Sequence, residues 1–251
     1  APGNAGINKI AKKVELDILN PEEVVNFCKS RSINFVIIGP EAPLLAGVSD
    51  ALRAAAILTF GPSKASSMLE ASKSFTKEIC NLGNIPTALS KTFHDPGTAK
   101  RYLNSCDFPI VIKADGLAAG KGVIIAETME IALNTIESMF SGKFGTAGES
   151  IVIEDFLEGE ELSYFVLCDG KTVLPIGSAQ DHKRAFDNDK GPNTGGMGAY
   201  SPATILTKKL EKKILSNIVM PTIEIMNAKG LPFSGVLYVG LMISNGDPSL
   251  I

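Results

Sequence analysis

Residues 109–127, PIVIKADGLAAGKGVIIAE, constrain the fold of this chain more than any other stretch. Two apolar runs rich in Val and Ile flank a loop of glycine and alanine, and β-branched residues of this kind favour strands. The segment therefore predicts two strands joined by a loop. The loop carries Lys113 at its entrance and Lys121 near its exit, which points to a bound anion.

The spacing of the loop glycines excludes the two common phosphate-binding motifs. A P-loop has four residues between its glycines and a hydroxyl residue after its lysine. Here three residues separate Gly116 from Gly120, and Gly122 follows Lys121. The dinucleotide pattern G-x-G-x-x-G is absent as well, and a strand follows where both motifs need a helix. We therefore expect the loop to act as a flap that covers its anion.

Composition limits the classes of partner. The chain has 251 residues, 45% of them apolar and 20% charged, with a net charge of −3. This balance gives no reason to expect nucleic acid or an anionic membrane as partner, and the longest apolar runs fall short of the ~20 residues that span a bilayer. No signal peptide is visible. The widely spaced Cys28, Cys80, Cys106 and Cys168 favour reduced, mostly buried thiols in a cytoplasmic protein.

The first 62 residues read as alternating helices and strands. Asn20 and Pro21 mark a helix start, with Asn as the cap and Pro at the first helical position. Residues 33–38 predict a strand buried on both faces, followed by a helix over 44–56 and a strand over 57–60. Each strand ends at a Gly-Pro pair. We expect a parallel β-α-β unit with ligands beyond the carboxyl ends of its strands.

A single long helix is expected over residues 63–83, with Lys73 and Lys77 on one face. After Pro86 the pattern changes to short strands, with one clear helix over 129–140. The region 151–167 predicts a strand, a turn and a second strand.

The last third of the chain mixes one polar segment with regular elements. Residues 181–202, DHKRAFDNDKGPNTGGMGAYSP, contain too little apolar surface to predict a regular element, so we expect a functional or disordered loop. A helix over 208–228 and a hairpin turning at 245–248 follow. Because the chain opens without Met on APGNAG and its last strand is short, we expect it to be an internal piece of a longer polypeptide.

Four features occur in an order that is informative only as a set. They are Lys73 on a helix, Lys113 at a strand end, Glu154 on an acidic strand, and the Gly-Glu-Glu at 159–161. In this order they resemble the ATP-grasp superfamily, in which two small α+β units hold ATP between them. These residue types suit ATP binding, because the phosphates need cations and the site needs a cover that excludes water.

Longer motifs narrow the resemblance to one family. The segments APGNAG, IIGPEAPL, FGP, SKSFTK, IVIKADGLAAGKGV, DHKR and GPNTGGMGAYSP, in this order, resemble the glycinamide ribonucleotide synthetases, or phosphoribosylamine–glycine ligases. The resemblance covers essentially the whole chain. It implies an α/β and α+β protein, with an ATP-grasp fold preceded by a partial Rossmann-like βαβ domain. The domains it implies are 1–62, the remainder of the N-terminal domain; 63–90 with 155–251, the larger ATP-grasp subdomain; and 91–154, the lid subdomain.

The resemblance also implies roles for individual residues. The residues implied to bind ATP are Lys73, Lys113, Gly116, Gly120, Lys121, Gly122, Glu154, Phe156, Leu157 and Glu161. Lys73 and Lys113 would bind the phosphates, and Glu161 would bind the ribose. Glu154 would lie at the adenine, together with the backbone of Phe156 and Leu157. The residues implied in catalysis are Lys121, Asp181, Lys183 and Arg184, and those implied to bind substrate are Asn193, Thr194, Gly195, Gly196, Met197 and Gly198.

The implied reaction is the ATP-dependent joining of glycine to 5-phosphoribosylamine in purine biosynthesis, through glycyl phosphate, with Mg²⁺ or Mn²⁺. The Glu-x-Asn pair that holds metal in the family is expected after residue 251, and a Gly-rich turn before residue 1. No metal ligand is therefore assigned within the chain, and this piece alone is expected to bind nucleotide poorly.

Two alternatives remain open. One is another ATP-grasp carboxylase or carboxylate–amine ligase, against which NTGGMGAYSP is the discriminating motif. The other is a non-catalytic nucleotide-binding module. The sequence shows no Ser-His-Asp or Cys-His arrangement; His182 stays a candidate for the site, whereas His94 is interpreted as a surface loop residue.

Overall fold

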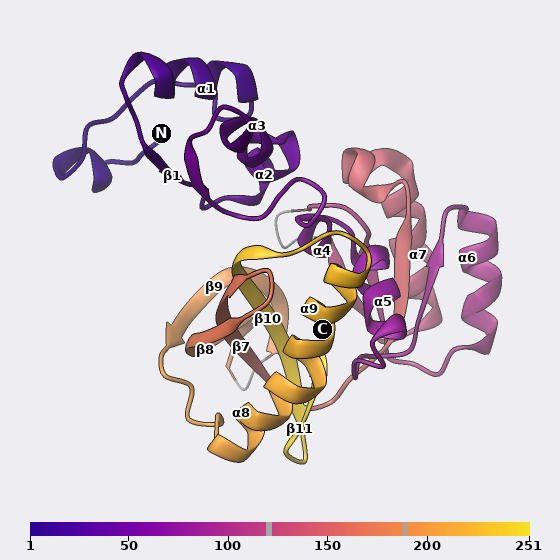
Figure 1. The fold of residues 1–251 in the computed structure, drawn as a ribbon. Helices are drawn as coiled ribbons and strands as arrows, with labels where there is room; N and C mark the ends of the chain where they lie inside the picture. The colour runs from indigo at the N-terminus through magenta and orange to yellow at the C-terminus, as the bar shows by residue number, and fades with distance from the viewer. Residues whose placement is uncertain (119–121, 188–189) are drawn as a thin grey trace.

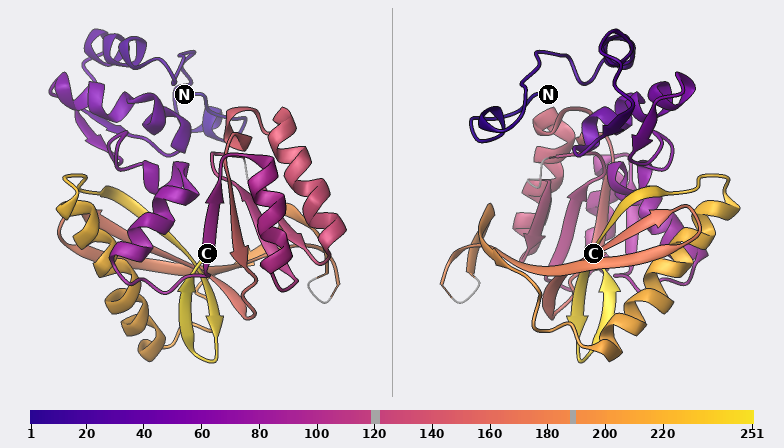
Figure 2. Two further views of the ribbon diagram at one scale, coloured as in Figure 1. Left: turned by 90° about the vertical axis from the view of Figure 1, so that its right-hand side faces the viewer. Right: turned by 60° about the vertical axis from the view of Figure 1, so that its left-hand side comes forward.

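The computed structural model describes residues 1–118, 122–187 and 190–251, which form three sheets with a hydrophobic core beside each (Figure 1). The sheets have two, four and five strands, in the orders β1-β2, β3-β6-β4-β5 and β11-β10-β7-β8-β9. The N-terminal unit lies at one end of the molecule, beside the two larger sheets (Figure 2).

The N-terminal unit contains the predicted parallel strand pair. Its elements are η1 (Ile7–Lys9), α1 (Pro21–Ser30), β1 (Phe35–Ile37), α2 (Glu41–Ala46), α3 (Val48–Ala54) and β2 (Leu58–Phe60). The helix start is confirmed, because the Asn20 side chain accepts hydrogen bonds from the amides of Glu22 and Glu23 at 3.1 and 3.2 Å. β1 and β2 pair in parallel, as expected.

Two predictions for this unit are wrong. The helix expected over 44–56 is broken at Gly47, which adopts a left-handed φ of 89° between α2 and α3. The first strand is not buried on both faces, since Phe35 and Ile37 are 55% and 67% exposed. Alternation along a strand explains this: Val36 packs on the helices of one face, and its neighbours point to the other face, which no described element covers.

The single helix expected over 63–83 is also wrong. The structure has two helices, α4 (Met68–Ala71) and α5 (Lys73–Leu82), with Ser72 in an extended conformation between them. The Ser72 hydroxyl accepts from the amide of Phe75 at 3.1 Å and so caps the second helix. Ser63 caps only the preceding turn, by accepting from the amide of Ser66 at 3.1 Å.

The four-stranded sheet is antiparallel and is covered on one face by two helices. Its elements are β3 (Ser90–Phe93), α6 (Pro96–Tyr102), η2 (Leu103–Ser105), β4 (Ile110–Ala114), β5 (Val123–Ala126), α7 (Met129–Ser138), the π turn η3 (Met139–Lys143), η4 (Gly145–Gly148) and β6 (Ile151–Asp155). The strand–loop–strand arrangement at 109–127 and the helix from residue 129 are therefore confirmed.

The five-stranded sheet packs against the C-terminal helices and α5. Its elements are β7 (Glu160–Asp169), β8 (Val173–Phe186), β9 (Lys190–Tyr200), α8 (Lys208–Ile214), the π turn η5 (Leu215–Val219), α9 (Met220–Ala228), β10 (Ser234–Ser244) and β11 (Asp247–Leu250). The predicted C-terminal helix is confirmed, with a π turn in its middle. The hairpin is confirmed too, with Asn245 and Gly246 both at positive φ.

The prediction that residues 181–202 form no regular element is wrong. They complete β8 and form β9, an antiparallel pair in which Asp181 faces Ala199 and His182 faces Gly198. Much of β9 is exposed, so backbone hydrogen bonding rather than apolar burial holds this ribbon. An estimate based on apolar content alone cannot detect such a strand.

Candidate functional site

A buried ionic cluster lies where α5 meets the four-stranded sheet. Lys113 Nζ is 2.9 Å from Glu154 Oε2, and Lys77 Nζ is 3.3 Å from the same oxygen. Glu154 pairs with Val111 in the strand register, so it lies on the same face of the sheet as Lys113. This face is opposite to the one that α6 and α7 cover.

The cluster has one uncompensated positive charge and one uncommitted acceptor. Lys77 also donates to Thr87 Oγ1 at 2.7 Å and to the Ala88 carbonyl at 3.1 Å, whereas Lys113 contacts only Glu154 among the described residues. Glu154 is 4% exposed, and its Oε1 has no hydrogen-bond partner in the described part of the chain. Burial lowers the pKa of Lys77, an effect that the Glu154 carboxylate opposes. The cluster can therefore accept an anion and a hydrogen-bond donor together.

Lys73 occupies the first position of α5 and approaches the start of the glycine loop. Its Nζ donates to the Gly116 carbonyl at 3.1 Å, and its backbone amide donates to the Asp115 carbonyl at 3.2 Å. Burial lowers the pKa of Lys73, the Asp115 carboxylate opposes that shift, and the positive charge of Lys113 adds to it. Lys73 and Lys113 therefore lie close enough for their positive charges to repel each other.

Asp115 fixes the entrance of the loop, and sequence reasoning missed it. Its carboxylate accepts from the Ser74 amide and hydroxyl, both at 2.7 Å, from Ser150 Oγ at 3.0 Å and from Ser72 Oγ at 3.2 Å. Burial alone would raise the pKa of Asp115, but these hydrogen bonds lower it below its usual value. Two features of the sequence could have indicated this role of Asp115. They are the serines on either side of Lys73 and the position of an acid directly after a strand.

The described loop glycines serve close packing rather than unusual φ angles. A Cβ on Gly116 would lie 2.8 Å from Ala147 Cα, and a Cβ on Gly122 would lie 2.6 Å from Ala118 Cβ. Neither residue has a positive φ. Gly120 and Lys121, and with them the predicted flap over the phosphate, lie outside the described residues.

The segment between the two large sheets leaves backbone groups open. Phe156 and Leu157 follow β6 and are half-buried, and their backbone groups form no hydrogen bond with any described residue. Beyond them, Glu161 Oε2 lies 2.8 Å from Lys183 Nζ, which is 3.8 Å from Asp181 Oδ2. Although burial favours the neutral amine, the hydrogen bond and charge of Glu161 raise the pKa of Lys183.

The residues of β9 lie beside this second cluster. The Thr194 hydroxyl donates to the Lys183 carbonyl at 2.8 Å and accepts from the Gly196 amide at 3.0 Å. A Cβ on Gly195, Gly196 or Gly198 would meet nothing within 4 Å, and of these only Gly196 has a positive φ.

The remaining predicted residues of this region are placed only in part. Met197 is 64% exposed. The rings of His182 and Tyr200 are stacked, with their centres 6.0 Å apart. The backbones of Arg184 and Asn193 pair, but their side chains fall outside the described part of the chain.

The described residues were also compared with the needs of a metal ion. In the described ranges, no group of three or more His, Cys, Asp or Glu side chains could hold an ion. The acids near Lys183 are committed to that lysine, so this donor set does not fit Mg²⁺ or Mn²⁺. No helix in the described part of the chain is long and apolar enough to cross a membrane.

Solved structures with the same arrangement show which fold this is. The biotin carboxylase domain of 2-oxoglutarate carboxylase from Hydrogenobacter thermophilus, in complex with MgADP, ADP and bicarbonate, matches with a TM-score of 0.74 at 17% identity, over 97% of this chain and 54% of that one. D-alanine–D-alanine ligase from Bacillus anthracis, complexed with ATP, matches with a TM-score of 0.66 at 18% identity, over 92% of this chain and 70% of that one. The fold is that of the ATP-grasp proteins.

Sequence comparison gives the family. Residues 1–70 match the N domain of phosphoribosylglycinamide synthetase, and residues 71–251 match its ATP-grasp (A) domain. The chain belongs to the phosphoribosylglycinamide synthetase family. It is 53% identical to phosphoribosylamine–glycine ligase of Rhizobium meliloti (strain 1021), over all of this chain and 59% of that protein. The crystal structure of the Thermotoga maritima phosphoribosylamine–glycine ligase matches with a TM-score of 0.85 at 30% identity, over 100% of this chain and 60% of that one.

Proposed function

We propose that the protein containing this chain is an ATP-dependent ligase that joins glycine to 5-phosphoribosylamine, giving glycinamide ribonucleotide, ADP and phosphate. The chain spans 59% of the length of the Rhizobium relative, so the activity of the whole protein is an inference. The observation that carries it is the buried cluster of Lys77, Lys113 and Glu154 in a chain of this family, which has one positive charge in excess and one buried acceptor oxygen without a partner among the described residues. Lys73 lies beside this cluster at the start of the glycine loop.

The nucleotide would lie across the junction of the two large sheets. Lys73 and Lys113 would bind its phosphates, since an ammonium reaches phosphate oxygens as a point charge. Glu154 Oε1 would accept from the adenine amine, and the open backbone of Phe156 and Leu157 supports an adenine edge there. The ATP-binding roles of Glu161, at the ribose, and of Gly116, Gly120, Lys121 and Gly122, over the γ-phosphate, belong to the same proposal.

The substrates would meet between β8 and β9. Asp181 and Lys183 would serve catalysis there, as would Arg184 and Lys121, and residues 193–198 would bind substrate. The open space around Gly195 and Gly198 supports this, because nothing in the described fold requires glycine at either position. Because glycine has no side chain, a ligand can approach the backbone closely at these positions.

The chemistry follows from the low reactivity of a carboxylate toward an amine. Phosphoryl transfer from ATP to the glycine carboxylate gives glycyl phosphate, whose carbonyl carbon the amine of phosphoribosylamine attacks, expelling phosphate. Lysines at the phosphates neutralise charge that spreads over the transferring oxygens. Mg²⁺ or Mn²⁺ would neutralise further phosphate charge, but we assign it no ligand among residues 1–251.

The proposal extends to the domain boundaries and the compartment. We divide the chain into residues 1–62, a larger ATP-grasp subdomain of 63–90 with 155–251, and a lid subdomain of 91–154. We place the protein in the cytoplasm; a relative from Arabidopsis thaliana, 51% identical over 100% of this chain and 48% of its own length, is named as chloroplastic, so compartment differs within the family.

Release of ADP by the full-length protein tests the proposal. We expect release that requires glycine and phosphoribosylamine together. Release with another carboxylate and amine, but not with this pair, would indicate a different carboxylate–amine ligase. ATP binding without turnover of any pair would indicate a non-catalytic nucleotide-binding module.

A further inference from the structure

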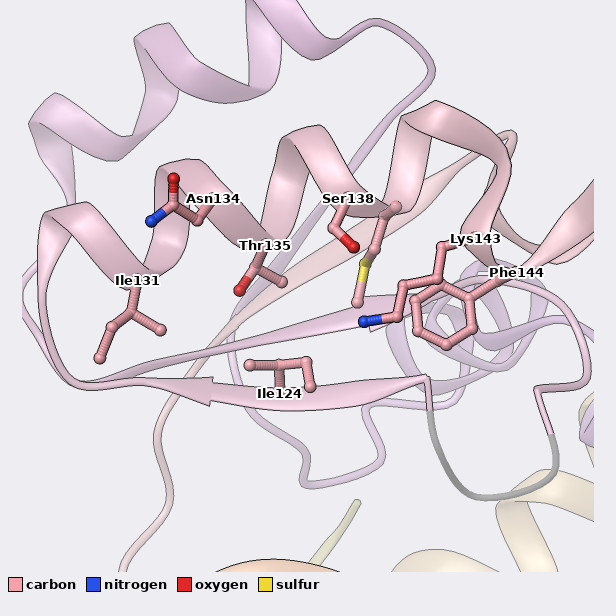
Figure 3. A pocket seen from close by; sticks show the side chains of 8 residues that line it. Ile124, Ile131, Asn134, Thr135, Ser138, Lys143 and Phe144 are labelled. Atoms are coloured by element: carbon pink, nitrogen blue, oxygen red, sulfur yellow. The ribbon is translucent and has the colours of Figure 1, made fainter.

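A surface hollow lies between β5 and α7, at the edge of the four-stranded sheet (Figure 3). Its volume is about 310 Å³, at the lower end of the range of small-molecule pockets, which begins at about 300 Å³. The residues that line it come from β5, α7, the π turn after α7 and the residue that follows: Ile124, Ile131, Asn134, Thr135, Ser138, Met139, Lys143 and Phe144.

The hollow is separate from the candidate nucleotide site. In the strand register Ile124 faces the fully buried Ile112, so its side chain points toward α7. Lys113 is the next residue along β4 and therefore points to the opposite face, where it meets Glu154. A ligand in the hollow would thus be divided from the nucleotide by the thickness of the sheet.

The lining combines an apolar floor with uncommitted polar groups. The floor includes Ile124, Met139 and Phe144, and the α7 side supplies the amide of Asn134 and the hydroxyls of Thr135 and Ser138. None of these three polar side chains forms a hydrogen bond with a described residue.

One cation gives the hollow its charge. Lys143 forms no ion pair in the described part of the chain, and its Nζ lies 5.7 Å from the centre of the Phe144 ring. Figure 3 shows the Lys143 side chain extending above Ile124. No Asp or Glu belongs to the lining, so the positive charge is not compensated within the hollow.

An irregular turn places Lys143 at this position. The π turn Met139–Lys143 contains Gly142 with φ 89° and ψ 9°, and a Cβ there would meet nothing within 4 Å. Here the turn redirects the chain after α7, so that Lys143 and Phe144 border the hollow.

We propose that this hollow binds a small apolar monoanion, of the class of the aromatic carboxylates. An aromatic ring would cover Ile124 beside Phe144, and the carboxylate would pair with Lys143. A single lysine does not balance the charge of a polyphosphate, so a second nucleotide is not favoured here. The proposal is independent of the ligase activity.

Titration of the full-length protein with 2-naphthoate, followed by methyl NMR of Ile124 and Ile131, tests this. We expect saturable shifts of both methyl signals, and binding about tenfold weaker in Lys143→Met because a charge-assisted contact is lost. The matched control is Lys91→Met, since Lys91 also lies over aromatic rings, at 5.7 Å from that of Phe93 and 5.1 Å from that of Tyr102, and lines no part of the hollow. Binding in that variant should not change.

Four results would overturn the proposal. One is the absence of shifts at millimolar 2-naphthoate, and another is equal affinity in the wild type and in Lys143→Met. The third is displacement of the probe by stoichiometric ATP, which would place it in the nucleotide site. Neutral 2-naphthalenemethanol should bind about tenfold more weakly than the carboxylate; equal binding would contradict the assignment of an anion.

Discussion

Lys113 and Glu154 form an ion pair of 2.9 Å between neighbouring strands, on the face of the sheet opposite to α7. A second cation, Lys77, lies 3.3 Å from the same carboxylate oxygen, so two ammonium groups share one buried carboxylate. This arrangement bears on both the packing of α5 and the proposed phosphate site. The Lys77 contact holds α5 against the sheet. The proposed phosphate role would use the positive charge that remains when two lysines share one carboxylate.

Replacement of Lys113 should weaken ATP binding. In Lys113→Ala we expect a ten- to hundredfold loss of affinity, since a charge-assisted contact contributes roughly 1.5–3 kcal/mol. Glu154 keeps Lys77 as its partner, so the fold should persist. Calorimetric titration of the full-length protein measures the change, with Lys91→Ala as the control on an exposed strand. Unchanged affinity in Lys113→Ala would remove this lysine from the phosphate site.

Replacement of Glu154 should reduce stability. Glu154→Gln keeps the shape but leaves two nearly buried lysines without a counter-charge, and we expect a loss of about 3 kcal/mol in the free energy of unfolding. The control is Glu137→Gln, because Glu137 pairs with Lys100 at 2.6 Å on the surface, where such pairs contribute about 0–1 kcal/mol. Urea unfolding of both variants measures the change in the free energy of unfolding. Equal losses of stability in the two variants would contradict a buried ionic role for Glu154.

Replacement of Asp115 should give a stability loss that depends on pH. The serine hydrogen bonds outweigh burial and lower the folded-state pKa of Asp115, so its stabilisation is present above the unfolded pKa of about 3.9 and is lost as pH falls through the folded value. Because Asp115 is only partly buried, we expect Asp115→Asn to cost about 1–2 kcal/mol at neutral pH. The gap to wild type should narrow below about pH 4. A constant gap down to pH 2 would show that the charge contributes nothing.

Replacement of Glu161 should separate binding from turnover. A ribose contact made equally in ground and transition states affects mainly KM, so Glu161→Gln should raise the KM for ATP more than it lowers kcat. The change also removes the negative charge that Lys183 meets at 2.8 Å. Steady-state kinetics with varied ATP measure both the KM for ATP and kcat. If kcat collapses while KM holds, Glu161 acts in the chemical step instead.

Replacement of Gly198 should impair substrate binding without loss of stability. A Cβ at Gly198 meets open space and its φ is not positive, so Gly198→Ala should leave the melting temperature unchanged. We expect a higher KM for glycine or phosphoribosylamine, because the methyl group would occupy the space that a substrate needs. Gly177→Ala is the matched control, since a Cβ there also meets nothing within 4 Å. The same KM in both variants would show that the glycines of β9 do not approach a substrate.

Local signals in the sequence predicted the elements that depend on neighbouring residues. The strands around the glycine loop follow from their β-branched runs, and α1 begins at its Asn20 cap. The break at Ser72 was missed because its cause is distant: Ser72 hydrogen-bonds to Asp115, which lies 43 residues away. β9 was missed because pairing with β8 replaces the apolar burial that a sequence pattern reveals.

The candidate site divides in the same way. Lys73, Lys113 and Glu154 were identified through a motif order that resembles the family. The shared carboxylate of Lys77 and Lys113 could not be predicted, because it depends on how α5 packs on the sheet. The serine contacts of Asp115 depend on the same packing and remained hidden for that reason.

The central claim is that ATP binds across the junction of the two large sheets, with its phosphates where α5 meets the four-stranded sheet. A crystal structure of the full-length protein with a non-hydrolysable ATP analogue tests it most directly. We predict phosphate oxygens within hydrogen-bonding distance of the ammonium groups of Lys73 and Lys113, and the adenine beside Glu154. A nucleotide bound elsewhere, with Lys113 still paired only to Glu154, would contradict the account.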